Sequence, residues 1–420
     1  MTMALQQHIT RRTFLKTAGL AAASLPVMTA RSYSRIPGAN ERLGVGIIGC
    51  GGMAQAHLNT LLNMPEAVEV VAVSDVFETR ARHFQDLIWR AGGRAESISD
   101  YRSLLDRDGL DYVTIATPEH WHAQQTLDAL DAGLHVYCEK PMTHRVDEAL
   151  AVLKKTQETG RRLQVGVQGM SDDSYASAYE AIKAGKIGPV IEAQIDYVRH
   201  YQDRGPWRTG VDPDLPQPSD LDWERWLGPA PRRPWSARRF FEWRNYRDYS
   251  GGVASDLFIH RLTRLIKACG LAFPTRVVGM GGIYLWEDGR ELPDHFEVLA
   301  EYPAVEGITP GMTVHILGTM GNRRGNDHLI RGHDATLIFT REGWEIIAQD
   351  SDEVIETHEK TGGEDINLHH RNLHDAIRNQ TPLHCPPDLG LYGVVAITGA
   401  VDSWFEKKML TWDAQRRRWT

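Results

Sequence analysis

The stretch that decides the fold of this chain is VGIIGCGGMA, residues 45–54. Its apolar first half predicts a buried strand, and the residues after the glycines, as far as Leu62, are compatible with a helix. Glycines at such a junction allow a diphosphate to approach the backbone N–H groups at the start of the helix. We therefore predict a dinucleotide-binding turn, with Gly49, Gly51, Gly52 and Met53 as candidate binding residues.

A second apolar run, VEVVAVSD at residues 68–75, ends in a carboxylate. An acid at the end of the second strand of such a unit binds the ribose hydroxyls of a dinucleotide. Because Asp75 favours a free 2′-hydroxyl and repels a 2′-phosphate, we expect NAD in preference to NADP. Arg80 lies a little further along the chain and is the feature that weakens this preference.

The composition is that of a globular protein of two domains. The chain has 420 residues, of which 42% are hydrophobic and 24% charged. A net charge of −8 gives no sign of nucleic-acid binding. The four cysteines lack the spacing of a metal site, and we expect no metal. Cys50 and Cys138 lie within the predicted cofactor site, so we expect both to be small buried residues that form no disulfide. No apolar run is long enough to span a bilayer.

The N-terminus contains TRRTFLK at residues 10–16, followed by a mildly apolar, alanine-rich stretch to Ala30. Paired arginines before such a stretch resemble a twin-arginine export signal, and the alternative is an ordinary basic tail. The resemblance implies the twin-arginine route, which exports proteins that have already folded, often around a cofactor. We therefore expect a periplasmic or exported protein that keeps its dinucleotide bound and regenerates it within the catalytic cycle.

The order of elements predicts the fold class. Strands and helices alternate between residues 43 and 165, which favours a parallel sheet with helices on both faces. Later apolar runs, at residues 191–199, 275–280, 296–302, 313–319 and 335–340, predict a large, mostly antiparallel open sheet. We expect an α/β protein with a leader at 1–42, an NAD-binding Rossmann domain at 43–165 and an α+β substrate and oligomerisation domain at 166–420.

Two polar motifs follow predicted strands: ATPEHWH at residues 116–122 and YCEKPM at 137–142. Ligands bind at the carboxyl ends of strands in open parallel sheets. With the glycine turn, these motifs resemble the glucose-fructose oxidoreductase / inositol dehydrogenase / rhizopine catabolism (Gfo/Idh/MocA) family. The matching residues are Gly46, Gly49, Gly51, Ala54, His57, Thr117, Pro118, His122, Glu139, Lys140 and Pro141. The candidate cofactor-binding residues are Gly49, Gly51, Gly52, Met53, Asp75, Thr117, Pro118, His120, His122, Glu139, Lys140 and Gln168.

A third motif of this family matches GGVASDLFIH at residues 251–260. Asp256 and His260 are four residues apart and share one face of a helix. The resemblance implies that Lys140 places positive charge beside the reacting oxygen and that His260 exchanges the hydroxyl proton, since its ordinary pKa is near neutrality. Asp256 is expected to hold the imidazole or a neighbouring hydroxyl. Read without the upstream motifs, the same residues fit an ordinary helix start.

The region from His200 to Ser250 is irregular and rich in Trp, Tyr and Arg, as expected of a functional loop. Aromatic faces stack on sugar rings, and arginines bind carboxylates, although most of these side chains are expected to pack the loop or remain solvated. The candidate substrate-binding residues are Trp121, Lys140, Tyr197, Trp207, Arg244, Asp256 and His260.

Two enzymatic interpretations and one non-enzymatic one follow. The first is an oxidoreductase acting on a secondary hydroxyl of a sugar, glycoside or cyclitol with tightly bound, recycled NAD. The alternative is an NAD-dependent glycosidase that works by transient oxidation and elimination. A cofactor-bound scaffold is disfavoured because Lys140, Asp256 and His260 are all present. The open sheet makes a homo-oligomer, a dimer or tetramer, the expected assembly.

Overall fold

The structure is a computed structural model that describes residues 42–420. The predicted twin-arginine segment lies outside the described residues. Within residues 42–420, no helix has both the length and the apolar character that a membrane crossing requires.

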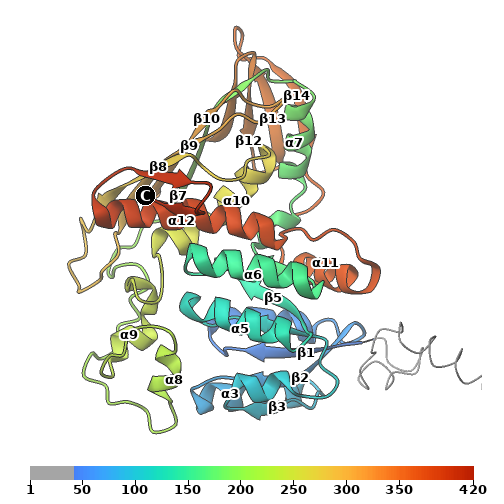
Figure 1. Cartoon of the computed structure of the whole chain (residues 1–420), viewed down its shortest axis with the longest axis vertical. Coiled ribbons are helices and arrows are strands. Elements are labelled where there is room, and N and C mark those ends of the chain that lie inside the picture. The colour runs from blue at the N-terminus through green and yellow to red at the C-terminus, as the bar shows by residue number, and fades with distance from the viewer. Residues whose placement is uncertain (1–41) are drawn as a thin grey trace, which may run out of the picture. The chain divides into compact units, whose positions relative to one another are not determined.

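The first sheet has six parallel strands in the order β3-β2-β1-β4-β5-β6 (Figure 1). This is the strand order of dinucleotide-binding folds, and it confirms the predicted Rossmann architecture. The strands are β1 (Leu43–Ile48), β2 (Val68–Ser74), β3 (Glu96–Ile98), β4 (Tyr112–Ile115), β5 (His135–Glu139) and β6 (Leu163–Gly166). All six residues of β1 are buried, as expected of a central strand with helices on both faces. The sequence did not predict β3, a three-residue edge strand with partly exposed side chains.

Helices connect the strands of this sheet, as the predicted alternation requires. They are α2 (Gly52–Leu62), α3 (Glu78–Arg90), α4 (Tyr101–Leu105), α5 (Glu119–Asp131) and α6 (Val146–Thr159). Helices α5 and α6 lie side by side over one face of the sheet (Figure 1). Pro118 is the N-cap of α5, so this helix begins at Glu119, directly after the Thr117-Pro118 motif. Its first turn therefore includes Glu119 and His120.

The second sheet has ten strands in the order β14-β13-β12-β11-β7-β10-β9-β8-β15-β16. The strands are β7 (Val190–Val198), β8 (Arg276–Gly282), β9 (His295–Tyr302), β10 (Met312–Thr319), β11 (His328–Gly332), β12 (Ala335–Phe339), β13 (Gly343–Ala348), β14 (Val354–Glu359), β15 (Leu410–Asp413) and β16 (Arg418–Trp419). Strands β7 and β10 run parallel, and the other neighbours are antiparallel. The predicted large, mostly antiparallel sheet is confirmed.

One face of this sheet packs against helices. Helices α7 (Ser174–Lys183), α10 (Ile259–Ala268) and α12 (Pro387–Glu406) contribute to a core that includes Phe258 and Phe296. The alternate residues of β8 and β9 point the other way, where Met280 is 67% and Leu299 is 52% exposed. The second sheet is therefore covered on one side and open on the other, at least along these two strands.

The C-terminal helices join the two domains. The first half of α12 packs with the Rossmann core through Leu391 and Val394, and its second half packs with the second core through Ile397 and Ala400. Helix α11 (Ile366–Asn379) also reaches the Rossmann domain, where Leu373 lies in its core. These shared helices fix the two sheets relative to each other.

Residues 199–250 form a long excursion between β7 and the Gly251-Gly252 turn. It contains the short helices α8 (Trp223–Leu227), α9 (Ala237–Phe241) and η4 (Trp243–Asn245), and in Figure 1 α8 and α9 lie beside the Rossmann domain. A backbone bridge between Phe77 and Leu221 attaches it just after β2. The excursion has a small core of its own, which includes Trp223, Trp226 and Phe240.

Candidate functional site

A cavity of about 1030 Å³, here called the crevice, extends from the glycine turn to Lys140 and His260. The Rossmann strands end along one side of it. The excursion forms part of the other wall with Arg225, Trp226, Phe240, Phe241, Trp243 and Arg244. Of the predicted site residues, all line this crevice except His120 and Trp207.

The glycine turn has the shape of a diphosphate cradle. Gly49 has φ +88°, and a Cβ there would lie 2.9 Å from the backbone carbonyl of Ala116. Side chains at Gly51 or Gly52 would meet no atom within 4 Å, so both border the open crevice. No side chain caps α2, and its first turn contains no acid. The N-terminus of α2 is therefore free to receive an anion.

Asp75 is held rigidly at the edge of this cradle. Its Oδ2 accepts a hydrogen bond from the backbone N–H of Cys50 at 2.7 Å, and its Oδ1 accepts one from that of Phe77 at 2.8 Å. Burial raises the pKa of Asp75, while the charge of Arg80 opposes that rise. Each oxygen keeps a second lone pair, which fits the recognition of ribose hydroxyls. These features together fit NAD.

Arg80 itself is packed among aromatic rings. Its guanidinium lies over the rings of Phe77, Phe240 and Phe241, with 5.0–5.7 Å between its carbon and the ring centroids. Two of these rings belong to the excursion. This part of the crevice wall is therefore built jointly by the Rossmann domain and the excursion.

Some residues of the motif at 116–122 line the crevice, and others are buried in the interior. Thr117 and Pro118 line the crevice, and His122 joins two strand ends through the carbonyl oxygens of Thr117 and Pro141. The prediction for His120 is not supported, because its buried ring faces the carbonyl oxygen of Trp226 at 3.0 Å. Burial lowers the pKa of His120 to about 3. His120 attaches the excursion and does not line the crevice.

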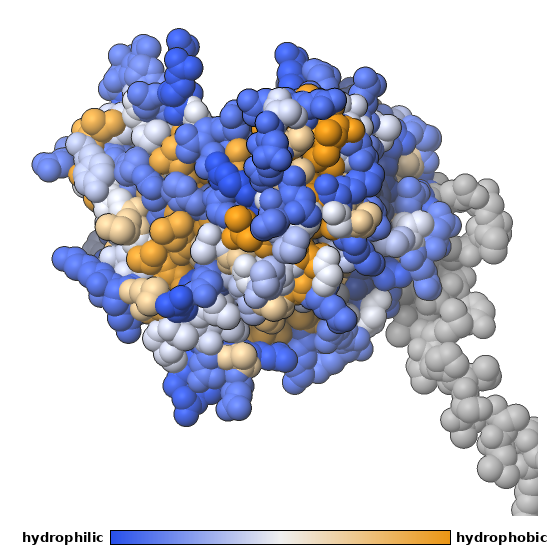
Figure 2. All heavy atoms as spheres, turned by 90° about the horizontal axis from the view of Figure 1, so that it is seen from above, coloured by the Kyte–Doolittle hydropathy of each residue, from blue (hydrophilic) through white to orange (hydrophobic). Residues whose placement is uncertain are grey.

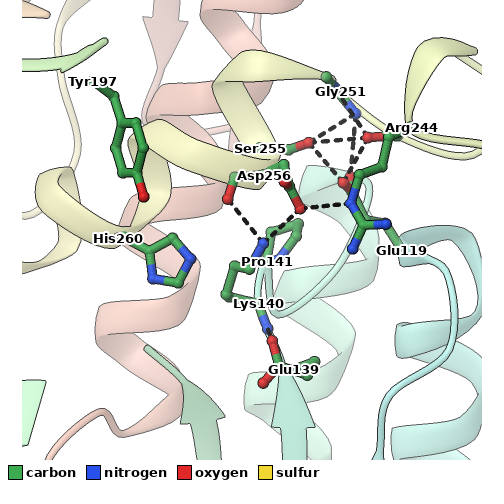
Figure 3. Close-up of polar contacts among 12 residues, drawn as sticks. Glu119, Glu139, Lys140, Pro141, Tyr197, Arg244, Gly251, Ser255, Asp256 and His260 are labelled. Carbon is green, nitrogen blue, oxygen red and sulfur yellow. Dashed lines mark hydrogen bonds and ion pairs between the residues drawn. The ribbon is translucent and has the colours of Figure 1, made fainter. Parts of the chain in front are cut away.

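Lys140 and Asp256 come from different domains and meet in the crevice (Figure 3). The Lys140 ammonium donates to both the backbone carbonyl oxygen and Oδ1 of Asp256, each at 2.8 Å. Arg244 Nε donates to the same Oδ1 at 2.9 Å. Burial favours the neutral acid, but the charges of Arg244 and Lys140 hold the pKa of Asp256 far below its usual range. Asp256 is therefore an anion shared by two cations.

His260 lies beside Lys140, on the same side as Tyr197 (Figure 3). Its Nδ1 is buried without a hydrogen-bond partner, and Glu364 Oε1 is 4.0 Å away. Burial and the charge of Lys140 lower the pKa of His260 to about 4, well below the ordinary value near neutrality on which its expected role was based. Among the described residues, Asp256 makes no hydrogen bond to the imidazole, and its Oδ1 accepts from Lys140 and Arg244 instead. A neutral, unpartnered imidazole is a competent proton acceptor.

Glu139 supports the base of the crevice from the end of β5. Its Oε1 accepts hydrogen bonds from His57 at 2.9 Å and from Gln168 at 3.2 Å. Burial opposes its ionisation, but the hydrogen bond and charge of His57 keep the pKa of Glu139 below its ordinary value. His57 in turn faces His370 of α11 at 2.9 Å. A chain of buried polar groups thus joins the site to the C-terminal helices.

The substrate end of the crevice contains Tyr197, Arg199, Trp243 and Arg244. The prediction for Trp207 is wrong, because this residue packs against the core of the second domain. Its neighbour Arg208 is fixed by Glu242 at 2.5 Å and Asp288 at 2.8 Å, and both pairs lie outside the crevice. Aromatic composition does not distinguish rings that pack a loop from rings that face a ligand.

The sequence did not single out Glu119 as a site residue. Its side chain is buried, and it hydrogen-bonds the turn that precedes Asp256 (Figure 3). The signal in the sequence was a charged residue directly after Thr117-Pro118, at a strand end. Its partners could not be predicted, because they lie 131 and more residues away.

Cys50 and Cys138 are free and buried, as predicted, and so are Cys269 and Cys385. Within residues 42–420, no group of three His, Cys, Asp or Glu side chains is arranged to hold a metal ion.

Comparison with known protein families identifies the family of this chain. Residues 43–167 match the model of the oxidoreductase family with an NAD-binding Rossmann fold, and residues 177–267 match the C-terminal alpha/beta domain of the same family. The chain belongs to the Gfo/Idh/MocA oxidoreductase family. The expected NAD-binding Rossmann domain is thereby confirmed.

The Gfo/Idh/MocA relatives with curated names are similar over part of their length. Inositol 2-dehydrogenase of Rubrobacter xylanophilus is 35% identical over 156 residues, 37% of this chain and 44% of that protein. A glycosyl hydrolase family 109 protein of Shewanella pealeana is 26% identical over 234 residues, 48% of this chain and 50% of that protein. The chain thus spans about half the length of the curated relatives it matches.

Solved Gfo/Idh/MocA structures share the fold over most of this chain. Levoglucosan dehydrogenase in complex with NADH and levoglucosan has a TM-score of 0.65 at 19% identity, covering 88% of this chain and 99% of that one. The WlbA dehydrogenase of Bordetella pertussis, in complex with NADH and UDP-GlcNAcA, has a TM-score of 0.64 at 19% identity, covering 88% and 98%. At this identity the likeness shows the fold alone.

Proposed function

We propose that this protein oxidises a secondary hydroxyl of a sugar, glycoside or cyclitol, using an NAD that stays bound and is recycled. The observation that carries the proposal is the convergence of Lys140, Asp256 and His260 in the crevice beside the glycine turn. The names of the relatives, inositol and levoglucosan dehydrogenases among them, support the substrate class.

The residues present have complementary parts in this chemistry. NAD, when bound, accepts the hydride. His260 is neutral and lines the crevice, so its imidazole can take the hydroxyl proton during oxidation and return it during reduction. Lys140 directs two donors at Asp256 and keeps a third N–H for the substrate oxygen as carbonyl character develops. Arg244 keeps its terminal nitrogens available for neighbouring hydroxyls of the substrate.

Retention of the cofactor is supported by the excursion. Because it is attached directly after Asp75 and lines the crevice, a bound dinucleotide would be enclosed between the Rossmann strands and this segment. Retention would suit the proposed twin-arginine export, since free NAD is scarce outside the cytoplasm. Protein isolated from its native host should release NAD on denaturation, and mass spectrometry that detects no nucleotide would contradict retention.

The alternative function is an NAD-dependent glycosidase with no net redox change. The Shewanella pealeana relative, named as a glycosyl hydrolase, is the observation in its favour. Incubation with free sugars and aryl glycosides, without added NAD, separates the two. Net reduction of bound NAD, reversed by a second carbonyl compound, supports the oxidoreductase. Release of the aryl group without net change in NADH absorbance supports the glycosidase.

We further propose that the open sheet face packs against a second copy of the chain. Seen from above the view of Figure 1, the surface has separate apolar patches among hydrophilic side chains (Figure 2). On β8 and β9, Met280 and Leu299 are exposed on the side that no helix covers. Apolar residues grouped on an open sheet are typical of interfaces between subunits.

A further inference from the structure

Glu119 is a buried acid that bridges the two domains. It lies in the first turn of α5, directly after the strand-end motif Thr117-Pro118, and is 1% exposed. Its Oε1 accepts hydrogen bonds from the hydroxyls of Ser250 and Ser255, both at 2.7 Å. Its Oε2 accepts a third, from the backbone N–H of Gly251 at 3.2 Å. All three donors belong to the turn that leads into Asp256.

Burial raises the pKa of Glu119, and the hydrogen bonds from Ser250 and Ser255 oppose that rise, so the bonding pattern favours a carboxylate at this position. The Ser255 hydroxyl accepts from Gly251 N–H at 2.9 Å, and the Ser250 hydroxyl accepts from Gly252 N–H at 3.0 Å. Each serine therefore has its single O–H left to donate, and both donate to Glu119. An ionised carboxylate accepts all three bonds, whereas an amide would turn its NH2 group toward one of the donors.

We infer that Glu119 is a positioning residue that sets the distance between Lys140 and Asp256. Ser255 directly precedes Asp256, and Asp256 binds the Lys140 ammonium through two oxygens. Glu119 and Lys140 both belong to the Rossmann domain, at the ends of neighbouring strands β4 and β5. Glu119 thus anchors the turn to the domain that carries Lys140.

Hydrogen bonds inside the turn, from Gly251 N–H to the Ser255 hydroxyl and from Asp256 N–H to the carbonyl oxygen of Gly252, hold its local shape, and Glu119 joins it to the Rossmann domain. Gly252 has φ +64°, and a Cβ there would lie 3.0 Å from the side chain of Leu292. Residues 254–258 continue as a π-helical turn, η5 (Ala254–Phe258), before α10 begins. Such wide turns are uncommon and occur frequently at functional sites. A small shift of the turn would move Asp256 away from Lys140, and a displacement of 1 Å can cost about 100-fold in rate.

The test is Glu119→Gln, and its kinetic part rests on the proposed function. Glu119 does not line the crevice, so the variant should keep bound NAD and a substrate KM within about threefold of wild type. Its kcat should fall about 100-fold. Glu148→Gln is the matched control, because Glu148 also lies in the first turn of a helix and bonds backbone N–H groups just ahead of that helix, among them that of Arg145 at 3.0 Å. This control should leave kcat unchanged.

A second measurement does not depend on activity. Acetic anhydride labelling of Lys140, followed by peptide mass spectrometry, reports how firmly its ammonium is held by Asp256. Labelling should be several-fold faster in Glu119→Gln than in wild type or Glu148→Gln. Equal labelling together with unchanged kcat would overturn the inference. If wild type oxidises no polyol, the proposed function fails, and the labelling rates alone decide the role of Glu119.

Should Glu119→Gln fail to fold, Ser255→Ala provides the same test by removing one donor. Ser255→Ala should speed labelling less than Glu119→Gln, because Ser250 and Gly251 still bind the carboxylate. Wild-type labelling in Ser255→Ala would overturn the inference.

Discussion

The ammonium nitrogen of Lys140 lies 2.8 Å from two oxygens of Asp256, a residue 116 positions away in the chain. One oxygen belongs to the backbone and the other to the carboxylate. Because one of these bonds goes to the backbone carbonyl oxygen, the position of the Lys140 ammonium depends on the conformation of the main chain at Asp256 as well as on its carboxylate. The reacting end of the crevice is therefore formed by the joining of two domains.

Replacement of Lys140 by methionine should remove turnover and leave the nucleotide bound. Methionine keeps much of the stem but has no N–H for the developing oxyanion, so we expect kcat to fall at least about 1000-fold. Steady-state rates and the NAD content of the purified variant measure the two effects. Lys155→Met is the control, because Lys155 pairs with Asp131 on the surface and should leave both values unchanged. A Lys140→Met enzyme that keeps most of its activity would refute this role.

The pH dependence should follow His260. Burial and Lys140 lower its pKa to about 4, so the imidazole is neutral at pH 7 and accepts a proton without first losing one. Because protonation removes the base, the oxidation rate should fall as pH drops below about 5 and stay flat toward neutrality. His260→Gln should lose about 100-fold or more in kcat at pH 7. A wild-type rate that rises through pH 6–7 would point to another base.

Part of this site follows from local sequence patterns and part does not. The glycine turn, Asp75 and Lys140 lie next to strand ends, so their placement depends on a short segment and could be predicted. Arg244 was named for its charge, but its bond to Asp256 depends on how the excursion folds. The lowered pKa of His260 could not be predicted, because burial and the nearness of Lys140 are tertiary properties.

The strands missed in the second domain have a similar cause. β13 and β14 form an edge hairpin in which β14 is largely exposed, so β14 lacks the apolar alternation that predicts a strand. β15 and β16 are short pieces near the C-terminus that add to β8. Such strands are set by the sheet they join, and the sequence alone carries little signal for them.

Buried histidines should make the fold sensitive to acid. Burial lowers the pKa of His369 and of His374 to about 4, below the value of about 6.5 expected in the unfolded chain. Between these values the unfolded state binds more protons, so stability is full above pH 6.5 and falls as pH drops toward 4. Each such group adds a slope of up to about 1.4 kcal/mol per pH unit.

Urea unfolding at pH 6.5, 5.5 and 4.5 measures this slope. His374→Gln removes one titrating group and should flatten it, while the amide can still bond Tyr112 as His374 does at 2.9 Å. His333→Gln is the control, because the His333 side chain is 79% exposed. Equal slopes in all three proteins would contradict the prediction.

The open sheet face should control assembly. Met280→Glu combined with Leu299→Glu places two charges on an exposed apolar part of neighbouring strands. If this face joins subunits, burying unpaired charges should shift the protein to a smaller species in light scattering after gel filtration. Trp89→Glu is the control, because Trp89 is 54% exposed on α3 of the other domain. A double variant that keeps the wild-type mass would exclude this face as the interface.

The attachment of the excursion should govern how long NAD stays bound. Asp220 Oδ2 accepts hydrogen bonds from the backbone N–H of Thr79 at 2.9 Å and from its hydroxyl at 2.6 Å, beside the bridge between Phe77 and Leu221. The double variant Asp220→Ala/Thr79→Ala loses both hydrogen bonds, and the backbone N–H at position 79 is left to solvent. If the excursion must move aside for release, the NAD off-rate should rise about tenfold, equivalent to about 1.4 kcal/mol.

Loss of bound NAD after dilution into an excess of an NAD analogue follows the off-rate directly. Asp214→Ala is the matched control, because Asp214 is an exposed acid on the same excursion. Its backbone N–H donates to Asp212, and it takes no part in the hydrogen bonds to Thr79. An unchanged off-rate in the double variant would show that the nucleotide leaves by a path that does not displace the excursion. Since the kcat of recycled turnover does not depend on release, kcat should stay at the wild-type value while the off-rate changes.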